Sequence, residues 1–440
     1  MVADSDIEKG GHLSHPDDVS TSGPEDAAHQ TDSEQLEKLD SEPPNGGLLA
    51  WSQVLGGILL NMLAWGYPTS FGVYQLYYRD TLKLPESQIS WIGSLQVFLA
   101  CAMCTFSGRL ADAGYIKSTI IAGSFLIVFG TFMTSLAKEY WQFFLAQGIC
   151  VGLGLGIIFM PPVSVINSYF TTKRSFVLSV AATGTGFGAV VFSATVQYLI
   201  PKVGFPWAVR CAAFVALSIA TLAVLILRPR LQPRKSGPLF EWEAFKEAPY
   251  AFYTLGAFLF FLALYFGFFY INAYARNVIG FSTTNSVQLI LITSGMSVPS
   301  RPIVGFLADR YFGPINLYIL HTLILGGLVF AWIGVHDRAG MYVFAFFFGL
   351  ANGAAQGLYS AALASLTTDP RKMGTRFGMV CTIMAFATLA GPPIAGAIID
   401  ATDGRYLYAQ MWAGLLLILA ACVIGCSRVA VTGWKFWVKI

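Results

Sequence analysis

Long apolar runs alternate with short connections that carry glycine, proline or charged residues from Leu48 onward. A helix needs about 20 mostly apolar residues to cross the hydrocarbon of a bilayer, because it rises about 1.5 Å per residue. Twelve runs are long enough, and they lie at about 50–74, 87–107, 116–137, 141–162, 175–199, 206–228, 249–273, 285–307, 315–335, 341–363, 375–399 and 405–427. The pattern predicts an all-α membrane protein with 12 transmembrane helices, and favours it over a core of buried soluble helices.

The first 47 residues break this pattern. They hold 12 of the 24 acidic residues of the chain and only two lysines, and they lack aromatic residues. Such a segment buries too little apolar surface to offset the entropy of ordering, so residues 1–47 are expected to be a disordered acidic tail. They lack the apolar stretch of a secretory signal, which leaves targeting to the first membrane helix.

Composition and charge narrow the class further. The chain is 55% hydrophobic and only 12% charged, which excludes an ordinary soluble enzyme. With the N-terminus inside, sixteen Lys and Arg fall in cytoplasmic connections and seven in outer ones. Basic residues are retained on the cytoplasmic side, so both termini are predicted to be cytoplasmic. The chain after residue 47 is basic, but it is also apolar along most of its length, so nucleic acid is not expected as a partner.

An internal repeat relates the two halves of the chain. The stretch Gly108-Arg109-Leu110-Ala111-Asp112 matches Gly305-Phe306-Leu307-Ala308-Asp309, an offset of 197 residues. A glycine ladder at 148, 152 and 156 matches one at 349, 353 and 357, an offset of 201 residues, and the basic pair at 173–174 matches that at 371–372, an offset of 198. The repeat predicts bundles of six helices at 48–228 and 248–428, a cytoplasmic linker at 229–247 and a cytoplasmic tail at 429–440.

Duplicated six-helix halves with G-x-L-A-D after the second helix of each resemble the major facilitator superfamily. The resemblance implies a substrate site between the halves near the bilayer midplane, with alternating access. A carboxylate at a helix end can accept N–H groups from a neighbouring helix N-terminus and so latch one conformation. The predicted latch comprises Gly108, Arg109, Asp112, Gly305, Asp309 and Arg310. A plain loop turn is the alternative.

Within that superfamily, three stretches resemble the monocarboxylate-transporter family, in particular its fungal branch. Residues 45–51 are similar to the family's acidic-Gly-Gly-x-x-Trp opening, with Asn45 in place of the acid. Residues 169–175 (Tyr-Phe-Thr-Thr-Lys-Arg-Ser) are similar to its Tyr-Phe-basic signature, and residues 391–396 with Asp400 are similar to its eleventh helix.

Arg301 is the sharpest candidate for a substrate contact. It lies about seven residues inside the eighth run, where a guanidinium is costly unless it faces a cavity, a carboxylate or an anionic ligand. The resemblance implies contact with a substrate carboxylate, for which bidentate donation is suited; snorkelling to the interface is the alternative. The family's proton-carrying aspartate is replaced by Ser297, and its first-helix lysine by Thr69 after Pro68. Both changes argue against simple lactate and proton symport.

Other polar residues inside the runs are weaker candidates for the substrate pathway. Asn352 and Gln356 share one helix face, because they are four residues apart. Each candidate could equally hold helices together by interhelical hydrogen bonds. The predicted binding set comprises Arg301, Ser297, Thr69, Tyr67, Asn61, Tyr270, Tyr274, Asn352 and Gln356.

The sequence therefore predicts a plasma-membrane secondary transporter of a small organic acid or related metabolite. The alternatives are an efflux carrier for a fungal secondary metabolite and a nutrient receptor that has lost transport. A membrane enzyme ranks last, because no acid–base pair, nucleophile or metal-ligand cluster falls at membrane depth. The expected partners are the small-molecule substrate and the lipid bilayer, with protons left open; no cofactor is expected.

Overall fold

The computed structural model of the protein describes residues 44–230, 241–367, 373–434 and 438. Every regular element in these ranges is helical. The tail expected to be disordered lies outside the described residues up to residue 43. Parts of the expected linker (231–240), of the C-terminal tail (435–437 and 439–440) and the basic pair at 371–372 lie outside them as well.

Eleven helical segments of the described chain are long and apolar enough to cross a membrane. One of them, Arg174–Ile226, has 53 residues, or about 80 Å of helix, more than twice the hydrocarbon thickness of about 30 Å. Gly204 interrupts it with φ 78° and ψ 163°, a conformation that glycine adopts readily. The segment therefore holds two crossings, and the twelve predicted transmembrane helices are confirmed.

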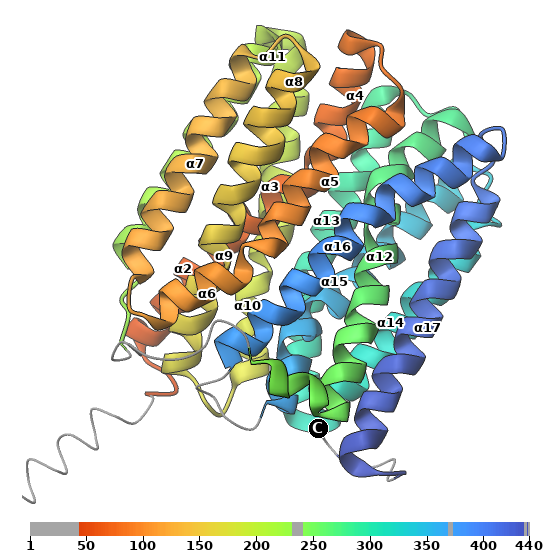
Figure 1. The fold of residues 1–440 in the computed structure, drawn as a ribbon. Coiled ribbons are helices and arrows are strands. Elements are labelled where there is room, and N and C mark those ends of the chain that lie inside the picture. Colours follow the sequence, from red (N-terminus) through yellow and green to blue (C-terminus); the bar gives the residue numbers. More distant parts are fainter. Residues whose placement is uncertain (1–43, 231–240, 368–372, 435–437, 439–440) are drawn as a thin grey trace, which may run out of the picture. The chain divides into compact units, whose positions relative to one another are not determined.

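Several crossings are built from more than one element (Figure 1). The elements of the N-terminal bundle are α2 (Leu48–Asn61), η1 (Met62–Gly66), α3 (Tyr67–Thr69), α4 (Phe71–Leu82), α5 (Glu86–Ala102), α6 (Cys104–Asp112), α7 (Ile116–Leu136), α8 (Tyr140–Phe143), η2 (Phe144–Val151), α9 (Gly152–Tyr169), α10 (Arg174–Ala182) and α11 (Gly184–Ile226). After η3 (Trp242–Lys246), the C-terminal bundle comprises α12 (Ala248–Asn277), α13 (Thr283–Leu307), η4 (Ala308–Phe312), α14 (Pro314–Trp332), α15 (Arg338–Leu366), α16 (Met373–Ala401) and α17 (Leu407–Thr432).

The two bundles meet along two pairs of helices. The second crossing (α5 and α6) packs against α16, and the fifth (α10 and the start of α11) packs against α13. At one of these contacts the hydroxyls of Thr105 and Thr382 lie 2.7 Å apart. Helices two and five of one half thus face helices eleven and eight of the other.

The predicted glycine ladders pack helices closely in both bundles. A Cβ on Gly152 or Gly156 would lie 3.0 or 2.7 Å from backbone oxygens of the second crossing. In the C-terminal bundle, a Cβ on Gly349 would lie 2.4 Å from the carbonyl oxygen of Thr293, and one on Gly357 would lie 3.2 Å from Cγ of Arg301. The second ladder therefore holds α15 directly against the part of α13 that carries Arg301.

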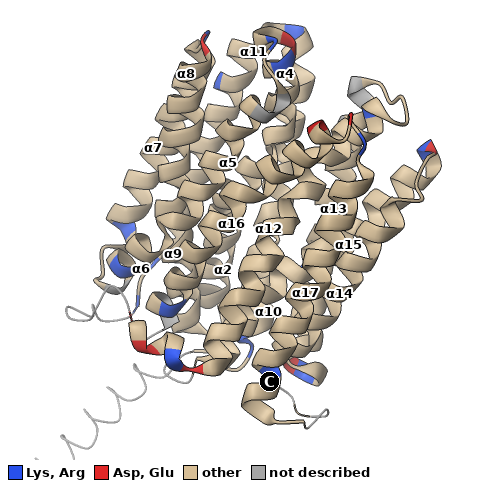
Figure 2. Cartoon of the chain, turned by 45° about the vertical axis from the view of Figure 1, so that its right-hand side comes forward, with Lys and Arg blue, Asp and Glu red and all other residues tan. Residues whose placement is uncertain are grey.

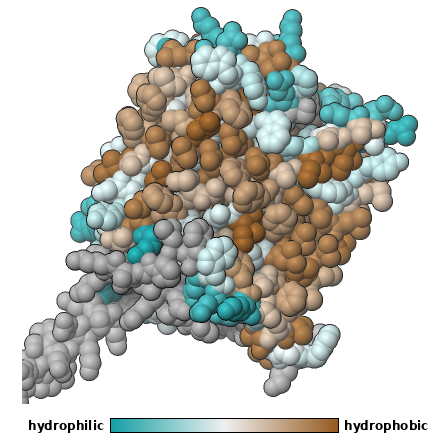
Figure 3. All heavy atoms as spheres, in the orientation of Figure 1, coloured by the Kyte–Doolittle hydropathy of each residue, from teal (hydrophilic) through white to brown (hydrophobic). Residues whose placement is uncertain are grey.

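The surface of the described residues suits a bilayer. Lys, Arg, Asp and Glu gather at the two ends of the helices (Figure 2), and apolar side chains cover the flank between them on the face drawn in Figure 3. Leu48 and Thr432 begin and end the twelve crossings, so both lie at the same end. We call it the cytoplasmic end, following the charge-based prediction.

Candidate substrate cavity

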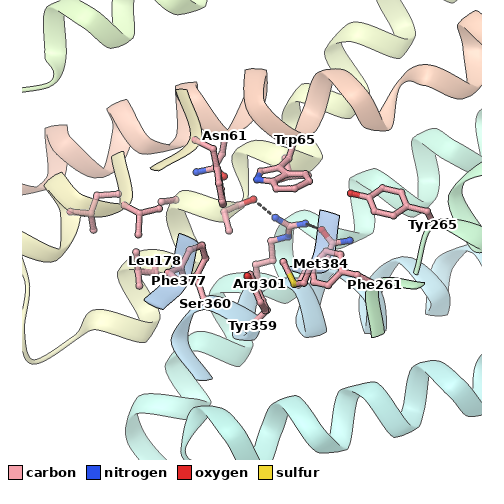
Figure 4. A pocket seen from close by; sticks show the side chains of 17 residues that line it. Asn61, Trp65, Leu178, Phe261, Tyr265, Arg301, Tyr359, Ser360, Phe377 and Met384 are labelled. Atoms are coloured by element: carbon pink, nitrogen blue, oxygen red, sulfur yellow. Dashed lines mark hydrogen bonds between the residues drawn. The ribbon is translucent and has the colours of Figure 1, made fainter. Parts of the chain in front are cut away.

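A cavity lies between the two bundles, around Arg301 (Figure 4). Five elements of the N-terminal bundle and four of the C-terminal bundle contribute to its wall. The lining residues are Asn61, Trp65, Phe159, Val163, Ile166, Leu178, Ala181, Ala182, Thr185, Phe261, Tyr265, Arg301, Gln356, Tyr359, Ser360, Phe377 and Met384. Its volume is about 70 Å³, far below the roughly 300–1,000 Å³ of sites for drug-sized ligands. The bundles must therefore separate before a metabolite of that size can enter.

Arg301 projects from α13 into this cavity and is 3% exposed. One terminal nitrogen donates to the carbonyl oxygen of Ala182, across the bundle interface, and the other donates to Oε1 of Gln356 at 3.2 Å. The Nε–H has no acceptor among the described residues. The lining contains no Asp or Glu within the described ranges, so the guanidinium charge is met only by neutral oxygens.

The amides of α15 extend the hydrogen bonding of Arg301. Gln356 accepts from the guanidinium with its oxygen and donates with Nε2 to Oδ1 of Asn352 at 3.0 Å. Asn352 is 1% exposed, and its Nδ2 has no acceptor in the described part of the chain. The four-residue spacing places both amides on one face of α15, as the sequence predicts.

Next to the cavity, the end of the eighth crossing holds the start of the fifth. Oδ2 of Asp309, in η4, accepts the backbone N–H of Phe176 at 2.8 Å. Phe176 is the third residue of α10, whose first N–H groups have no partner within the helix. A Cβ on Gly305 would lie 2.7 Å from Ser179, so this end of α13 approaches α10 closely. The carboxylate thus meets a helix N-terminus in the way proposed for a latch.

Comparison with known proteins now identifies the family. The pattern of the Major Facilitator Superfamily matches residues 54–367. An MFS-type transporter of Gibberella zeae is 41% identical over 390 residues, which cover 88% of each chain. The chain belongs to the Major Facilitator Superfamily. It is therefore a membrane transporter in a family of carriers rather than enzymes.

Two further comparisons bear on this carrier. The aspyridones efflux protein of Emericella nidulans is 34% identical over 90% of this chain and 81% of its own. The crystal structure of the human organic anion transporter TETRAN matches with a TM-score of 0.68 over 87% of this chain and 100% of that one. Because the sequence identity is 14%, the likeness is limited to the fold.

Other predicted site residues of the carrier lie on or near the cavity wall. Asn61 lines it and donates from Nδ2 to the carbonyl oxygen of Gly57 at 2.9 Å. Ser297 is one turn before Arg301 and is 4% exposed, but its hydroxyl donates to Ser294 at 2.7 Å. A Cβ on Gly353 would lie 2.7 Å from that of Ser297. The serine therefore lies in a tight helix interface where related carriers are expected to have an acid.

Six residues of the predicted binding set do not line the cavity. Two of them, Ser297 and Asn352, were described above, and the other four make hydrogen bonds within one bundle. The Thr69 hydroxyl donates to Trp65 at 2.6 Å, and the Tyr67 hydroxyl accepts from Thr131 at 3.2 Å. In the C-terminal bundle, Tyr270 donates to the carbonyl oxygen of Pro392 at 3.0 Å and Tyr274 donates to that of Val335 at 2.7 Å. The Thr69 bond lies within the first crossing, and the other three join different parts of one bundle. The part of these four residues in substrate binding stays a prediction.

Aromatic residues that the sequence analysis did not select form much of the cavity wall. Six of the 17 lining residues are aromatic, against 15% of the chain. The rings of Trp65 and Phe159 meet edge to face with centroids 5.1 Å apart, and those of Phe261 and Tyr359 do so at 5.4 Å. Four-residue spacing from Asn61 would have pointed to Trp65.

The structure describes contacts for some of the predicted latch residues but not for all of them. The carboxylate of Asp309 has the contact given above, whereas the side chain of Asp112 lies outside the described part of the structure. The guanidinium of Arg310 stacks over the exposed ring of Tyr311 at 5.7 Å. Gly108 is buried and Arg109 is half-buried, near the end of α6. A latching role for the set stays a prediction.

Two family-like stretches that are distant in sequence contact each other at the cytoplasmic end. Oδ1 of Asn45 accepts from the backbone N–H groups of Thr171 and Thr172 at 2.7 and 3.1 Å, and their hydroxyls lie at 3.1 and 3.3 Å. The N–H of Asn45 donates to the carbonyl oxygen of Tyr169 at 3.0 Å. A neutral amide oxygen thus ties the segment before α2 to the turn before α10. Asn45 stands where the monocarboxylate-transporter opening that this stretch resembles has an acid.

Proposed function

We propose that this transporter exports an acidic fungal secondary metabolite across the plasma membrane, and that Arg301 binds the anionic group of the substrate. The observation that carries the proposal is the buried guanidinium in an interbundle cavity whose described lining has no carboxylate. The name of the relative from Emericella nidulans supports export as the direction.

Electrostatics favours an anion over a neutral or cationic substrate. Removing a charged group from water costs several kcal/mol even after relaxation, and neutral acceptors offset only part of that cost. An ionised oxygen at the guanidinium would form a charge-assisted hydrogen bond, roughly twice as strong as a neutral one. A cation in the same cavity would be repelled. The open Nε–H adds a donor for such a group.

The same lining gives little support for proton coupling at the cavity. Its described residues include no Asp, Glu or His, and Ser297 occupies the position one turn before Arg301. No group of the wall therefore exchanges a proton near neutral pH. We propose that the substrate crosses as its anion, without a proton carried by the protein at this site. Membership of the monocarboxylate-transporter-like branch stays a prediction.

The apolar part of the wall sets the remaining chemistry of the substrate. Aromatic and aliphatic side chains supply most of the lining, and they stabilise apolar surface by removing it from water. The amides of Asn61 and Gln356 add a few hydrogen-bonding positions. This combination suits an amphipathic metabolite with one acidic group better than a short, strongly hydrated acid.

The decisive experiment compares Arg301→Gln with Arg210→Gln in a strain that lacks the native gene. Untargeted metabolite profiling of cells and medium first identifies the product that is retained without the carrier. Arg210 is the matched control, because it donates to Ser135 at 3.2 Å and stacks over Trp207 at 4.9 Å, both in the N-terminal bundle.

Arg301→Gln should lower export by about tenfold to a hundredfold, the effect of losing a hydrogen bond to a charged group. Arg210→Gln should export at the wild-type rate, and both variants should reach the membrane in equal amounts. Wild-type export by Arg301→Gln at normal abundance would refute Arg301 as the substrate contact.

A further inference from the structure

The cytoplasmic half of the fifth crossing is a short helix of its own. α10 ends at Ala182, and α11 begins at Gly184 after a turn at Thr183. At this break the N–H of Gly186 donates to the carbonyl oxygen of Thr183 at 3.0 Å, rather than to that of Ala182 four residues back, as in a regular helix. The carbonyl oxygen of Ala182 is thereby free to accept from another part of the molecule.

Three hydrogen bonds join α10 to the C-terminal bundle, one at each turn. The N–H of Phe176 donates to Asp309 at 2.8 Å, the hydroxyl of Ser179 donates to the carbonyl oxygen of Gly357 at 3.2 Å, and Ala182 accepts from Arg301. Positions 176, 179 and 182 share one face because they are three residues apart. The innermost of the three bonds is the one made by the cavity arginine.

The start of α11 packs against both bundles. A Cβ on Gly184 would lie 2.1 Å from the carbonyl oxygen of Ile58, and one on Gly188 would lie 2.3 Å from that of Met62. These close approaches hold α11 against the first crossing. On its other side, a Cβ on Gly186 would lie 2.8 Å from the carbonyl oxygen of Ser294 in α13. Across the break at Thr183, α10 packs more extensively on α13, α15 and η4 than on α2 and α9.

We propose that the carbonyl oxygen of Ala182 is the resident acceptor of Arg301 in the empty carrier, and that the acidic group of the substrate replaces it. This inference rests on the proposed function in taking Arg301 as the substrate contact. A carboxylate accepts from a guanidinium more strongly than a neutral carbonyl does. Binding then favours the state in which α10 has lost its innermost hydrogen bond. Loading of the cavity thereby releases this one tie between α10 and the C-terminal bundle, next to the break at Thr183.

The first test needs no ligand. Hydrogen–deuterium exchange is measured on peptides spanning residues 174–188 in purified full-length protein in lipid nanodiscs, for the wild type, Arg301→Gln and Arg210→Gln. Loss of the Ala182 bond should raise amide exchange in α10 by about tenfold or more, while Arg210→Gln stays at the wild-type rate. A peptide from α7 serves as the internal reference. Equal exchange in α10 of wild type and Arg301→Gln would overturn the proposed tie.

The second test adds a small carboxylate as a probe. Benzoate carries an ionised group on a flat ring, and benzamide is its neutral counterpart of similar shape. Benzoate should raise exchange in α10 of the wild type several-fold and leave Arg301→Gln unchanged, and benzamide should have no effect on either. No change with benzoate in the wild type, or an equal change with benzamide, would overturn the replacement of the carbonyl by a carboxylate.

The two proposals fail in different ways. If Arg301→Gln exports normally but exchanges faster in α10, the proposed function fails and the structural tie stands. If export is lost while exchange in α10 of the empty protein is unaltered, Arg301 binds the substrate without holding α10.

Discussion

Replacing Gln356 by Glu puts a carboxylate beside Arg301 without changing the size of the side chain. Oε1 of Gln356 already accepts from the guanidinium at 3.2 Å, so the substituted side chain reaches the same nitrogen in the same rotamer. The variant gains an internal counter-ion where the wild type has only neutral acceptors. We expect it to mimic the charge of a bound anion and to compete with the acidic group of the substrate.

The size of the effect follows from the bond that is replaced. Hydrogen bonds to charged groups contribute about 1.5–3 kcal/mol, so apparent affinity for an acidic substrate should fall by about tenfold to a hundredfold. The unpaired buried charge of the wild type is also compensated in the variant. Gln356→Glu should therefore unfold at a temperature equal to or above that of the wild type, which separates loss of transport from loss of fold.

The assay is concentration-dependent transport of the identified product into inside-out vesicles, with thermal unfolding of the purified protein alongside. Gln142→Glu is the matched control, because Oε1 of Gln142 accepts from backbone N–H groups at residues 138 and 139, far from the cavity. If Gln356→Glu transports an acidic substrate with the same affinity as Gln142→Glu, Arg301 is not the anion contact and the electrostatic reasoning fails.

Two further predictions concern packing and driving force. Gly353→Ala should lower the free energy of unfolding by about 1–3 kcal/mol through overpacking, because the new Cβ would lie 2.6 Å from Cα of Ser297 and 2.4 Å from Oγ of Ser300. Thermal unfolding compares this variant with Gly327→Ala, whose new Cβ would have no atom within 4 Å. Equal unfolding temperatures of the two variants would contradict the close α13–α15 contact. Export of an anion without a proton carries net charge, so transport into inside-out vesicles should rise when a valinomycin-imposed potassium gradient makes the vesicle interior positive, and indifference to that potential would speak for an electroneutral cycle.

The number of membrane crossings was predictable because it depends on the length of the apolar runs. Each predicted run falls on a crossing, and the two runs at 175–199 and 206–228 anticipated the break at Gly204 within one continuous helical segment. Run length says nothing of where a helix is interrupted internally, so the break at Thr183 and the freed carbonyl of Ala182 were not foreseen.

Which residues of a helix face the cavity was harder to predict, for geometric reasons. On α12 the cavity is lined by Phe261 and Tyr265, four residues apart. Tyr270 follows Tyr265 by five residues, which is a rotation of about 140° from that face, and it contacts Pro392 instead. In the first crossing, the π-helical segment Met62–Gly66 lies between Asn61 and Tyr67. Its wider turn changes the register, so a regular helical wheel does not place Tyr67.

The serine at 297 links the chemistry of the cavity to the direction of transport. With an acid one turn before Arg301, an empty carrier would hold a neutral pair and would need a proton to release the arginine for a substrate. Here the guanidinium rests on the Ala182 carbonyl and Gln356, and the anion alone completes the charge balance. A cycle of this kind exports one negative charge with each substrate. Moving one charge across a membrane potential is worth about 2.3 kcal/mol per 100 mV, a concentration ratio of about 50. An interior-negative membrane drives anions outward, so the charges absent from this cavity are those that export does not require.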